Sequence, residues 1–137
     1  MRVLPVFAVA ALFVLPGCEL IQETLSDTDG VSCAHSEGAR AVYIDIVSYE
    51  AGPKGDCTVD PGTRITWRGP PGEMRSFEIA FTGGVSPGGR GTPQDYPSHD
   101  TGGRQRASLV ANGTPGTTYP YEIRVDGQAI DPAIIIR

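Results

Sequence analysis

Three features are absent from this sequence of 137 residues, and each absence excludes a class of protein. No apolar run reaches the roughly 20 residues that a transmembrane helix needs. No stretch shows the sustained helical period of apolar residues that is typical of a helical domain. Basic residues are spread along an acidic chain with a net charge of −5, so the sequence has no basic patch of the kind that binds nucleic acid.

The first 17 residues have the pattern of a secretory signal. A positive start at Arg2 is followed by the apolar run Val3 to Leu15, which is too short to span a membrane. A buried core helix is the other interpretation of this run. Pro5 and Pro16 disfavour it because proline interrupts a helix interior.

The tetrapeptide LPGC at residues 15–18 resembles the lipobox of bacterial lipoproteins, in which a small residue precedes an invariant cysteine. The resemblance implies cleavage after Gly17 and attachment of lipid to Cys18, which would anchor the protein to a membrane. Several acyl chains are needed for firm anchoring, because a single chain binds only marginally. Glu19, rather than aspartate, follows the cysteine, and this resemblance implies the outer membrane of a Gram-negative bacterium.

Cysteine occurs only three times, at Cys18, Cys33 and Cys57. If Cys18 carries lipid, the other two can pair, because an exported chain meets an oxidising compartment. The bridge would close a loop of roughly 25 residues and contribute about 3 kcal/mol in the chain-entropy model. Two separate buried thiols are the alternative.

The chain after the signal divides into a tether and one domain. Residues 18–39 are rich in Glu, Asp, Ser, Thr and Gly without an apolar period, so we expect a lipid anchor followed by a mobile tether. Residues 40–137 have the size of a single domain.

Within this domain, short stretches alternate between apolar and polar residues, as half-buried strands do. The predicted strands are Ala41–Tyr49, Thr63–Trp67, Ser76–Phe81, Arg106–Ala111, Thr118–Val125 and Ala133–Ile136. Asp126-Gly127 predicts a tight hairpin turn after one of them. Six or seven short strands with regular turns indicate a two-sheet sandwich.

Three motifs resemble the cupredoxin family over residues 40–136. VDPGTRITW at residues 59–67 is similar to a strand-entry signature, SFEIAF at 76–81 to the next strand, and YPYEIRVDG at 119–127 to the penultimate strand. The expected fold is therefore all-β, a Greek-key β-sandwich of about seven strands that is cupredoxin-like. An immunoglobulin-like sandwich is the alternative.

The copper ligands of that family are missing from the matching positions. A blue copper site needs two histidines and a thiolate. The segment 68–76 contains no histidine, no cysteine stands near Ile123, and no histidine stands near Asp126. The resemblance therefore implies the fold and not the copper chemistry, and we expect no metal site and no cofactor.

The segment Thr82 to Gln105 has no apolar period and exceeds the usual length of a loop. It is either a plain crossover between the sheets or a contact loop for a partner. Tyrosine and arginine are common anchors in interfaces, so the candidate contact residues are Arg90, Tyr96, His99 and Arg104.

No catalytic residues are predicted, because no acid–base pair can be defended. Ser98-His99-Asp100 contains the residue types of a catalytic triad, but a triad is assembled in space and not from sequence neighbours. We expect a non-enzymatic cell-envelope lipoprotein, a binding or structural module whose partner is an envelope protein or a glycan and not nucleic acid. The alternative is a metal-handling protein with a non-standard site around His99, Met74 and the acidic groups.

Overall fold

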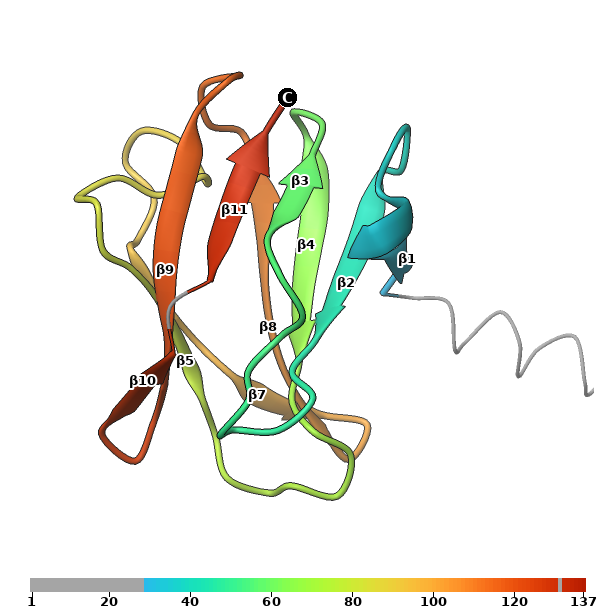
Figure 1. Ribbon diagram of the computed structural model, residues 1–137, viewed down its shortest axis with the longest axis vertical. Helices are drawn as coiled ribbons and strands as arrows, with labels where there is room; N and C mark the ends of the chain where they lie inside the picture. Colours follow the sequence, from blue (N-terminus) through green and yellow to red (C-terminus); the bar gives the residue numbers. More distant parts are fainter. Residues whose placement is uncertain (1–28, 131) are drawn as a thin grey trace, which may run out of the picture.

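The computed structural model describes residues 29–130 and 132–137, which form an all-β sandwich (Figure 1). One sheet has the strand order β1-β2-β4-β8-β7. Its strands are β1 (Val31–Ser32), β2 (Ala41–Asp45), β4 (Thr63–Arg68), β8 (Arg104–Ala111) and β7 (His99–Thr101). The predicted signal, the lipidation of Cys18 and the tether as far as residue 28 lie outside the described residues.

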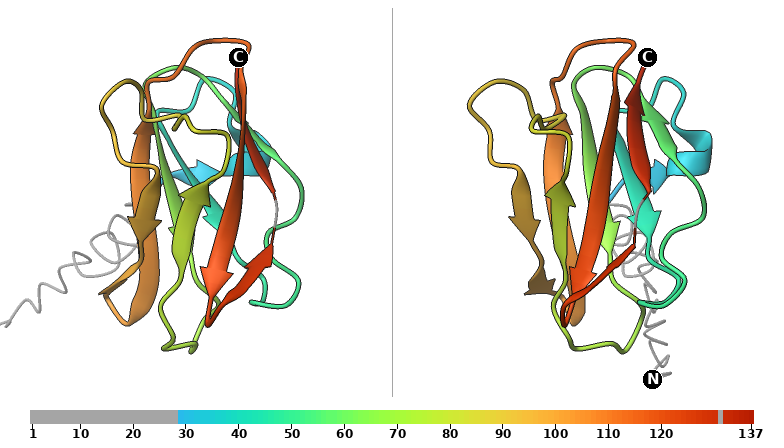
Figure 2. Two further views of the ribbon diagram at one scale, coloured as in Figure 1. Left: turned by 90° about the vertical axis from the view of Figure 1, so that its left-hand side faces the viewer. Right: turned by 60° about the vertical axis from the view of Figure 1, so that its left-hand side comes forward.

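The second sheet has the order β3-β11-β9-β5-β6, with β10 also paired to β9. Its strands are β3 (Cys57–Val59), β11 (Ala133–Ile136), β9 (Thr118–Val125), β5 (Glu78–Phe81), β6 (Asp95–Pro97) and β10 (Gln128–Ile130). Both sheets are mixed, because β2 runs parallel to β4 and β3 runs parallel to β11. Figure 2 shows the two sheets in profile, packed face to face.

The alternating patterns build the core, as the sequence predicted. Every second residue of a strand faces inward, so Ile65 and Trp67 from the first sheet meet Tyr121 and Ile123 from the second. All four are at most 1% exposed. The predicted β-sandwich is therefore confirmed.

The hairpin at Asp126-Gly127 is also confirmed. The two residues have φ angles of 50° and 81° and connect β9 to β10, which pair antiparallel. A two-residue hairpin turn of type I′ requires positive φ at both central positions, which aspartate tolerates and glycine adopts without strain.

The structure has eleven strands among the described residues, rather than about seven. The strands without a predicted range are β1, β3, β6, β7 and β10, which have only two or three residues each. The first four lie at the sheet edges, and β10 pairs with β9 alone. Strands this short carry no readable alternation. The segment 82–105 is accordingly not one long loop, because β6, β7 and the start of β8 lie within it. The strand predicted for residues 41–49 ends at Asp45, and a turn closed by Gly52 N to Ser48 O (2.8 Å) follows.

Residues 29–39 belong to the domain, although the sequence placed them in a mobile tether. Val31 pairs with Val42 through β1 and β2, and a 3₁₀ helix, η1 (Cys33–His35), follows. Cys33 is bonded to Cys57 of β3, which confirms the predicted disulfide. The described residues contain no helix that is long and apolar enough to cross a membrane.

Candidate functional site

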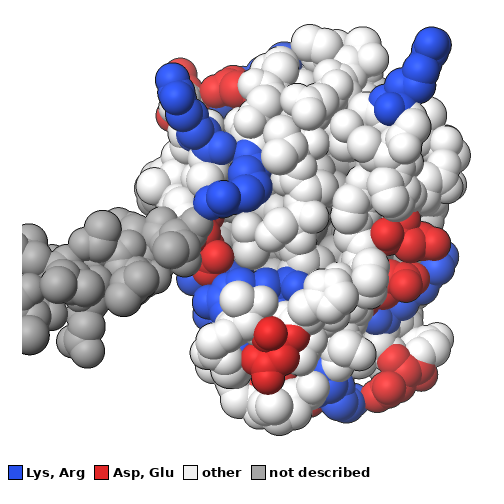
Figure 3. All heavy atoms as spheres, turned by 180° about the vertical axis from the view of Figure 1, so that it is seen from behind, with Lys and Arg blue, Asp and Glu red and all other residues white. Residues whose placement is uncertain are grey.

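The outer face of the five-stranded sheet carries a concentration of arginine. Ile65 and Trp67 of β4 point into the core, so Arg64, Thr66 and Arg68 point outward. The same alternation turns Arg104, Arg106 and Ser108 of β8 outward. Figure 3 views the molecule from this side and shows basic side chains gathered on the left of the face, beside a largely uncharged area.

Strand pairing places two of these arginines in one row with a histidine and an aspartate. His99 of β7 pairs with Arg106 of β8, Arg106 pairs with Arg68 of β4, and Arg68 pairs with Asp45 of β2. The row therefore crosses four strands whose residues are far apart in the sequence. We call these residues, together with Arg64 and Arg104, the arginine face.

Arg68 is the most constrained side chain of the arginine face. Its Nε and Nη2 donate to the two oxygens of Asp45 at 2.7 and 2.9 Å, a bidentate geometry. The guanidinium carbon lies 3.7 Å from the centre of the Tyr43 ring, in a cation–π contact. The hydrogen bonds to Asp45 raise the pKa of Arg68.

Arg104 is also held within the domain. Its Nε donates to the carbonyl oxygen of Gly69 at 2.7 Å, and its Nη2 lies 3.3 Å from Asp45. Burial lowers the pKa of Arg104, and the neighbouring charge of Arg68 acts in the same direction. Arg104 therefore fixes the start of the loop between β4 and β5 to the sheet.

Asp29 lies between Arg68 and Arg106. One of its carboxylate oxygens is 3.1 Å from Arg106 Nε and 3.5 Å from Arg68 Nη1. The Asp29 side chain is only 10% exposed. Arg68 and Arg106 are direct cross-strand neighbours, and like charges in that position repel unless an anion lies between them. Asp29 supplies that anion.

A hollow of about 500 Å³ opens beside this ion pair. Arg64, Arg106, Asp29 and His99 supply its charged and titratable groups, and hydroxyl-bearing residues supply much of the rest. The lining residues are Asp29, Arg64, Thr66, Tyr96, Pro97, His99, Thr101, Arg106, Ala107 and Ser108. The hydroxyls of Thr66 and Ser108 are 3.0 Å apart and lie in the row next to the arginine pair.

The structure does not bring the four predicted contact residues together. Tyr96 and His99 both line this hollow, but the Tyr96 ring packs edge-on to Phe81 and its hydroxyl lies 3.1 Å from Ser86. Arg90 is exposed and lines a different hollow, formed by residues 84–86, 89–92, 94, 112–115 and 119. Arg104 contacts Gly69 and Asp45 instead.

Sequence reasoning missed Asp29, Arg64, Arg68 and Arg106. Alternation in the predicted strand Thr63–Trp67 places Arg64 outward, so one signal for the arginine face was available. The pairing of Arg68 with Arg106 depends on the register between β4 and β8, and the sequence does not reveal it.

An ion-pair cluster stands near two positions where the cupredoxin resemblance would place copper ligands. Arg75 contacts Glu73 at 2.8 Å and Asp126 at 3.2 Å, and its carbonyl oxygen accepts a hydrogen bond from Tyr49 at 2.6 Å. Hydrogen bonds from Arg75 lower the pKa of Glu73 to about 2. Burial is the main cause of the raised pKa of Tyr49. Ile123 is fully buried in the core.

The described residues contain no group of three or more His, Cys, Asp and Glu side chains arranged to hold a metal ion. Met74 lies in the loop between β4 and β5, where its side chain is exposed. His99 lies on β7, next to Arg106 in the cross-strand row. His35, the other histidine, is exposed at the end of η1.

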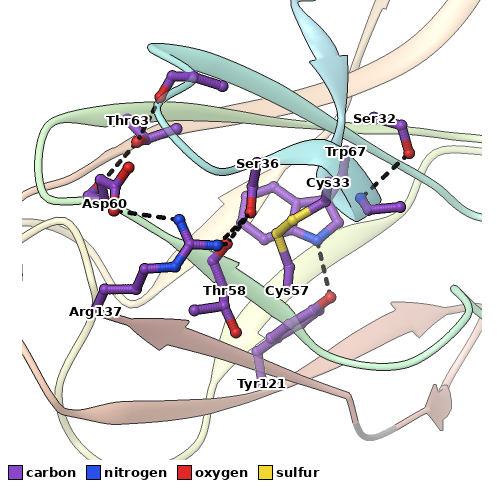
Figure 4. Close-up of a disulfide and its surroundings, with 12 residues drawn as sticks. Ser32, Cys33, Ser36, Cys57, Thr58, Asp60, Thr63, Trp67, Tyr121 and Arg137 are labelled. Atoms are coloured by element: carbon purple, nitrogen blue, oxygen red, sulfur yellow. Dashed lines mark hydrogen bonds and ion pairs between the residues drawn. A yellow bond between two sulfur atoms is a disulfide. The ribbon is translucent and has the colours of Figure 1, made fainter.

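The disulfide attaches the segment before β2 to the second sheet (Figure 4). The Cα atoms of Cys33 and Cys57 are 5.8 Å apart, within the ordinary range for a disulfide. Arg137 strengthens the attachment, because its guanidinium donates to Ser36 Oγ at 3.0 Å and to Asp60 at 3.2 Å. Residues 33–36 are thus held by covalent and polar contacts together.

Sequence comparison finds no protein-family model and no curated protein that matches this chain. The fold and the arginine face define the molecule as a β-sandwich domain with a charged, hydroxyl-rich hollow, which the outer face of one sheet and β6 of the other sheet line together.

Proposed function

We propose that this protein is a non-enzymatic lipoprotein of the cell envelope whose sandwich is a binding module. Lipid on Cys18 would anchor it in the outer membrane of a Gram-negative bacterium, as the signal pattern and the LPGC motif imply. The domain would be a cupredoxin-like sandwich without the copper ligands. Its partner would be another envelope component, an acidic protein or glycan.

The arginine face is the observation that carries this proposal. Four of the 11 basic residues, Arg64, Arg68, Arg104 and Arg106, share one face of one sheet, although the whole chain has a net charge of −5. Asp45 and Asp29 balance two of these four positive charges, which leaves an excess of two on the face. A local excess of positive charge on an acidic protein directs anionic partners to that face. No other strand covers the face in the described residues.

The arrangement of Ser98, His99 and Asp100 supports a non-enzymatic role. The Ser98 hydroxyl is buried, accepts a hydrogen bond from the Phe77 amide at 2.8 Å and donates to Gln105 at 2.8 Å. Asp100 instead accepts a hydrogen bond from the amide of Gly103 at 3.0 Å. Neighbouring residues of a strand point to opposite faces, so His99 and Asp100 cannot act on the same side of β7.

Co-purification from solubilised envelopes tests the proposal. The full chain carries an affinity tag, and the wild type is compared with the double variant Arg64→Gln and Arg106→Gln. The matched control is Arg124→Gln, which removes an exposed arginine from β9 on the other sheet. We expect a partner that the double variant loses and the control retains. Capture that is identical for all three chains, or no capture at all, would contradict the proposal.

A further inference from the structure

We propose that the arginine face contains an anion-binding site for an acidic sugar, and that Asp29 is an internal carboxylate that competes for it. This inference rests on the proposed function and specifies its ligand and its regulation. The observation that carries it is the position of Asp29 between Arg68 and Arg106, two like charges that strand pairing places side by side.

The position of Asp29 shows what the site accepts. A carboxylate already lies within ion-pair distance of both guanidinium groups, and its side chain is largely buried there. Charge-assisted hydrogen bonds of this kind suit carboxylate and phosphate groups equally, because both present oxygen acceptors to the planar guanidinium. A ligand anion at the same position would neutralise the repulsion between Arg68 and Arg106 just as Asp29 does.

The surroundings of the arginine pair favour a sugar over a peptide. Protein interfaces have an apolar core, often with aromatic side chains and methionine. Val110 is the sole large hydrophobic side chain exposed on the outward positions of β4 and β8. The hollow, which Tyr96 and Pro97 line in part, offers the side chains of Thr101 and Ser108, which match the hydroxyls of a sugar ring. Thr66 lies buried beneath Ser108 and supports it through the contact between their hydroxyls.

The backbone of the segment that carries Asp29 is held to the first sheet by a short strand pairing only. Strand β1 contributes only Val31 and Ser32 to the sheet, at its edge. Short edge pairings open with a small free-energy cost. The disulfide at Cys33 keeps the following residues in place, so release of Asp29 does not require the sandwich to unfold.

The backbone conformation of Gly30 positions Asp29 between the two arginines. Its φ angle is +90°, and a Cβ atom there would collide with the backbone and side chain of Ala41. Glycine is required for this close approach. Substitution at Gly30 therefore displaces Asp29 without changing any charge.

Because the ligand and Asp29 compete for the same site, ligand binding and displacement of Asp29 are reciprocally coupled. A ligand that takes the place of Asp29 shifts residues 29–32 away from the sheet, and displacement of these residues strengthens ligand binding by the same factor. Residues 29–32 would thus change position according to whether the domain has bound its ligand.

Calorimetric titration of the full chain in detergent at low salt tests this inference. The probes are a short oligosaccharide of glucuronic acid, its neutral glucose counterpart and an oligoglutamate peptide of the same charge. We expect the acidic sugar to bind and the neutral sugar to fail. Asp29→Asn should raise the affinity for the acidic sugar about tenfold, since it removes the competing charge.

Three further variants separate the site from general electrostatics. Gly30→Ala should raise the affinity as Asp29→Asn does, Arg106→Gln should abolish binding, and Arg124→Gln on the opposite sheet should leave it unchanged. Amide hydrogen exchange at residues 30–32 should accelerate when the acidic sugar is added. Urea unfolding of each variant verifies that the sandwich remains folded.

Several results would overturn the inference. They are equal binding of the acidic and neutral sugars, tighter binding of the peptide, or affinity that Asp29→Asn leaves unchanged. Failure of the envelope co-purification would refute the proposed function alone, because the titration does not depend on a natural partner. Conversely, a captured partner with no acidic-sugar binding would refute this inference alone.

Discussion

Trp67 of β4 and Tyr121 of β9 join the two sheets through a buried hydrogen bond. The indole Nε1 donates to the phenolic oxygen at 3.0 Å, and the two rings meet edge to face with centroids 5.5 Å apart (Figure 4). Both side chains are at most 1% exposed. The contact gives the only tryptophan of the chain a polar partner inside an otherwise apolar core.

Replacement of Tyr121 by phenylalanine should lower the free energy of unfolding by about 1–3 kcal/mol. The substitution removes the acceptor and leaves the indole N–H of Trp67 buried without a partner. Urea unfolding followed by tryptophan fluorescence measures the loss directly. Tyr119→Phe is the control, because the Tyr119 hydroxyl accepts a hydrogen bond from the amide of Thr114 in a partly exposed turn. Equal losses in the two variants would contradict the role assigned to the Trp67 contact.

The contrast between long and short strands explains how far the sequence could predict the fold. Thr118–Val125 and Ala133–Ile136 were predicted with their observed bounds, because alternation or an apolar run extends over four residues or more. Strands β6 and β7 are three polar-rich residues each at sheet edges, where backbone pairing and not side-chain burial selects the conformation. Short edge strands also limit strand pairing between molecules. This role does not require an apolar pattern in the sequence, so the sequence gives no sign of it.

Only a small part of the candidate site was predicted, because most of its contacts join residues that are far apart in the sequence. His99 was identified as a contact residue and lies at one end of the cross-strand row. Asp29 was assigned to a mobile tether, because an acidic residue in a polar stretch has no local signal of burial. Its contact with Arg68 and Arg106 is long-range and depends on the register of β4 with β8.

Loss of the disulfide should destabilise the domain by about 3 kcal/mol. Cys33 and Cys57 are 24 residues apart, and the bond limits the freedom of the unfolded chain between them. The double variant Cys33→Ser and Cys57→Ser is compared with the wild type by urea unfolding, with and without a reducing agent. The reductant should destabilise the wild type and leave the double variant unchanged. A folded, non-reduced wild-type chain with two reactive thiols at these positions would contradict the prediction.

Glu73 should contribute to stability at neutral pH and lose that contribution in acid. Its pKa is lowered from 4.5 to about 2 by hydrogen bonds from Arg75. A carboxylate whose pKa is lower in the folded state stabilises the fold above its unfolded pKa, and the contribution falls as pH decreases through the folded value. We therefore expect stability to fall between about pH 4.5 and pH 2, and Glu73→Gln to flatten this part of the profile. The side chain is accessible to solvent, so the effect should shrink in high salt. An identical profile in the variant would show that other carboxylates control the acid response.

Replacement of Cys18 by alanine should release the protein from the membrane fraction or leave it unprocessed. The expectation follows from the apolar signal and the LPGC motif, since the sulfur of Cys18 would be the attachment point for lipid in the proposed lipoprotein. Fractionation and electrophoretic mobility are the measurements, and Cys33→Ser serves as the control that changes a cysteine without touching the motif. A Cys18→Ala chain that fractionates and migrates as the wild type does would refute lipid attachment.

The purified protein should stay colourless when it is titrated with Cu(II). The intense colour of a blue copper site comes from a bond between copper and a cysteine thiolate. Cys33 and Cys57 are joined in a disulfide, so neither presents a thiolate in the oxidised domain. The position at Ile123 is an apolar side chain in the core, and Asp126 is paired with Arg75. His35 and His99 can bind Cu(II) only as exposed imidazoles, without the thiolate band. Absorption spectroscopy of the oxidised protein, repeated after reduction, measures the outcome. An intense visible band at one copper per oxidised chain, lost in Cys57→Ala, would show that a copper site exists and that the strand assignments to the cupredoxin motifs are misplaced.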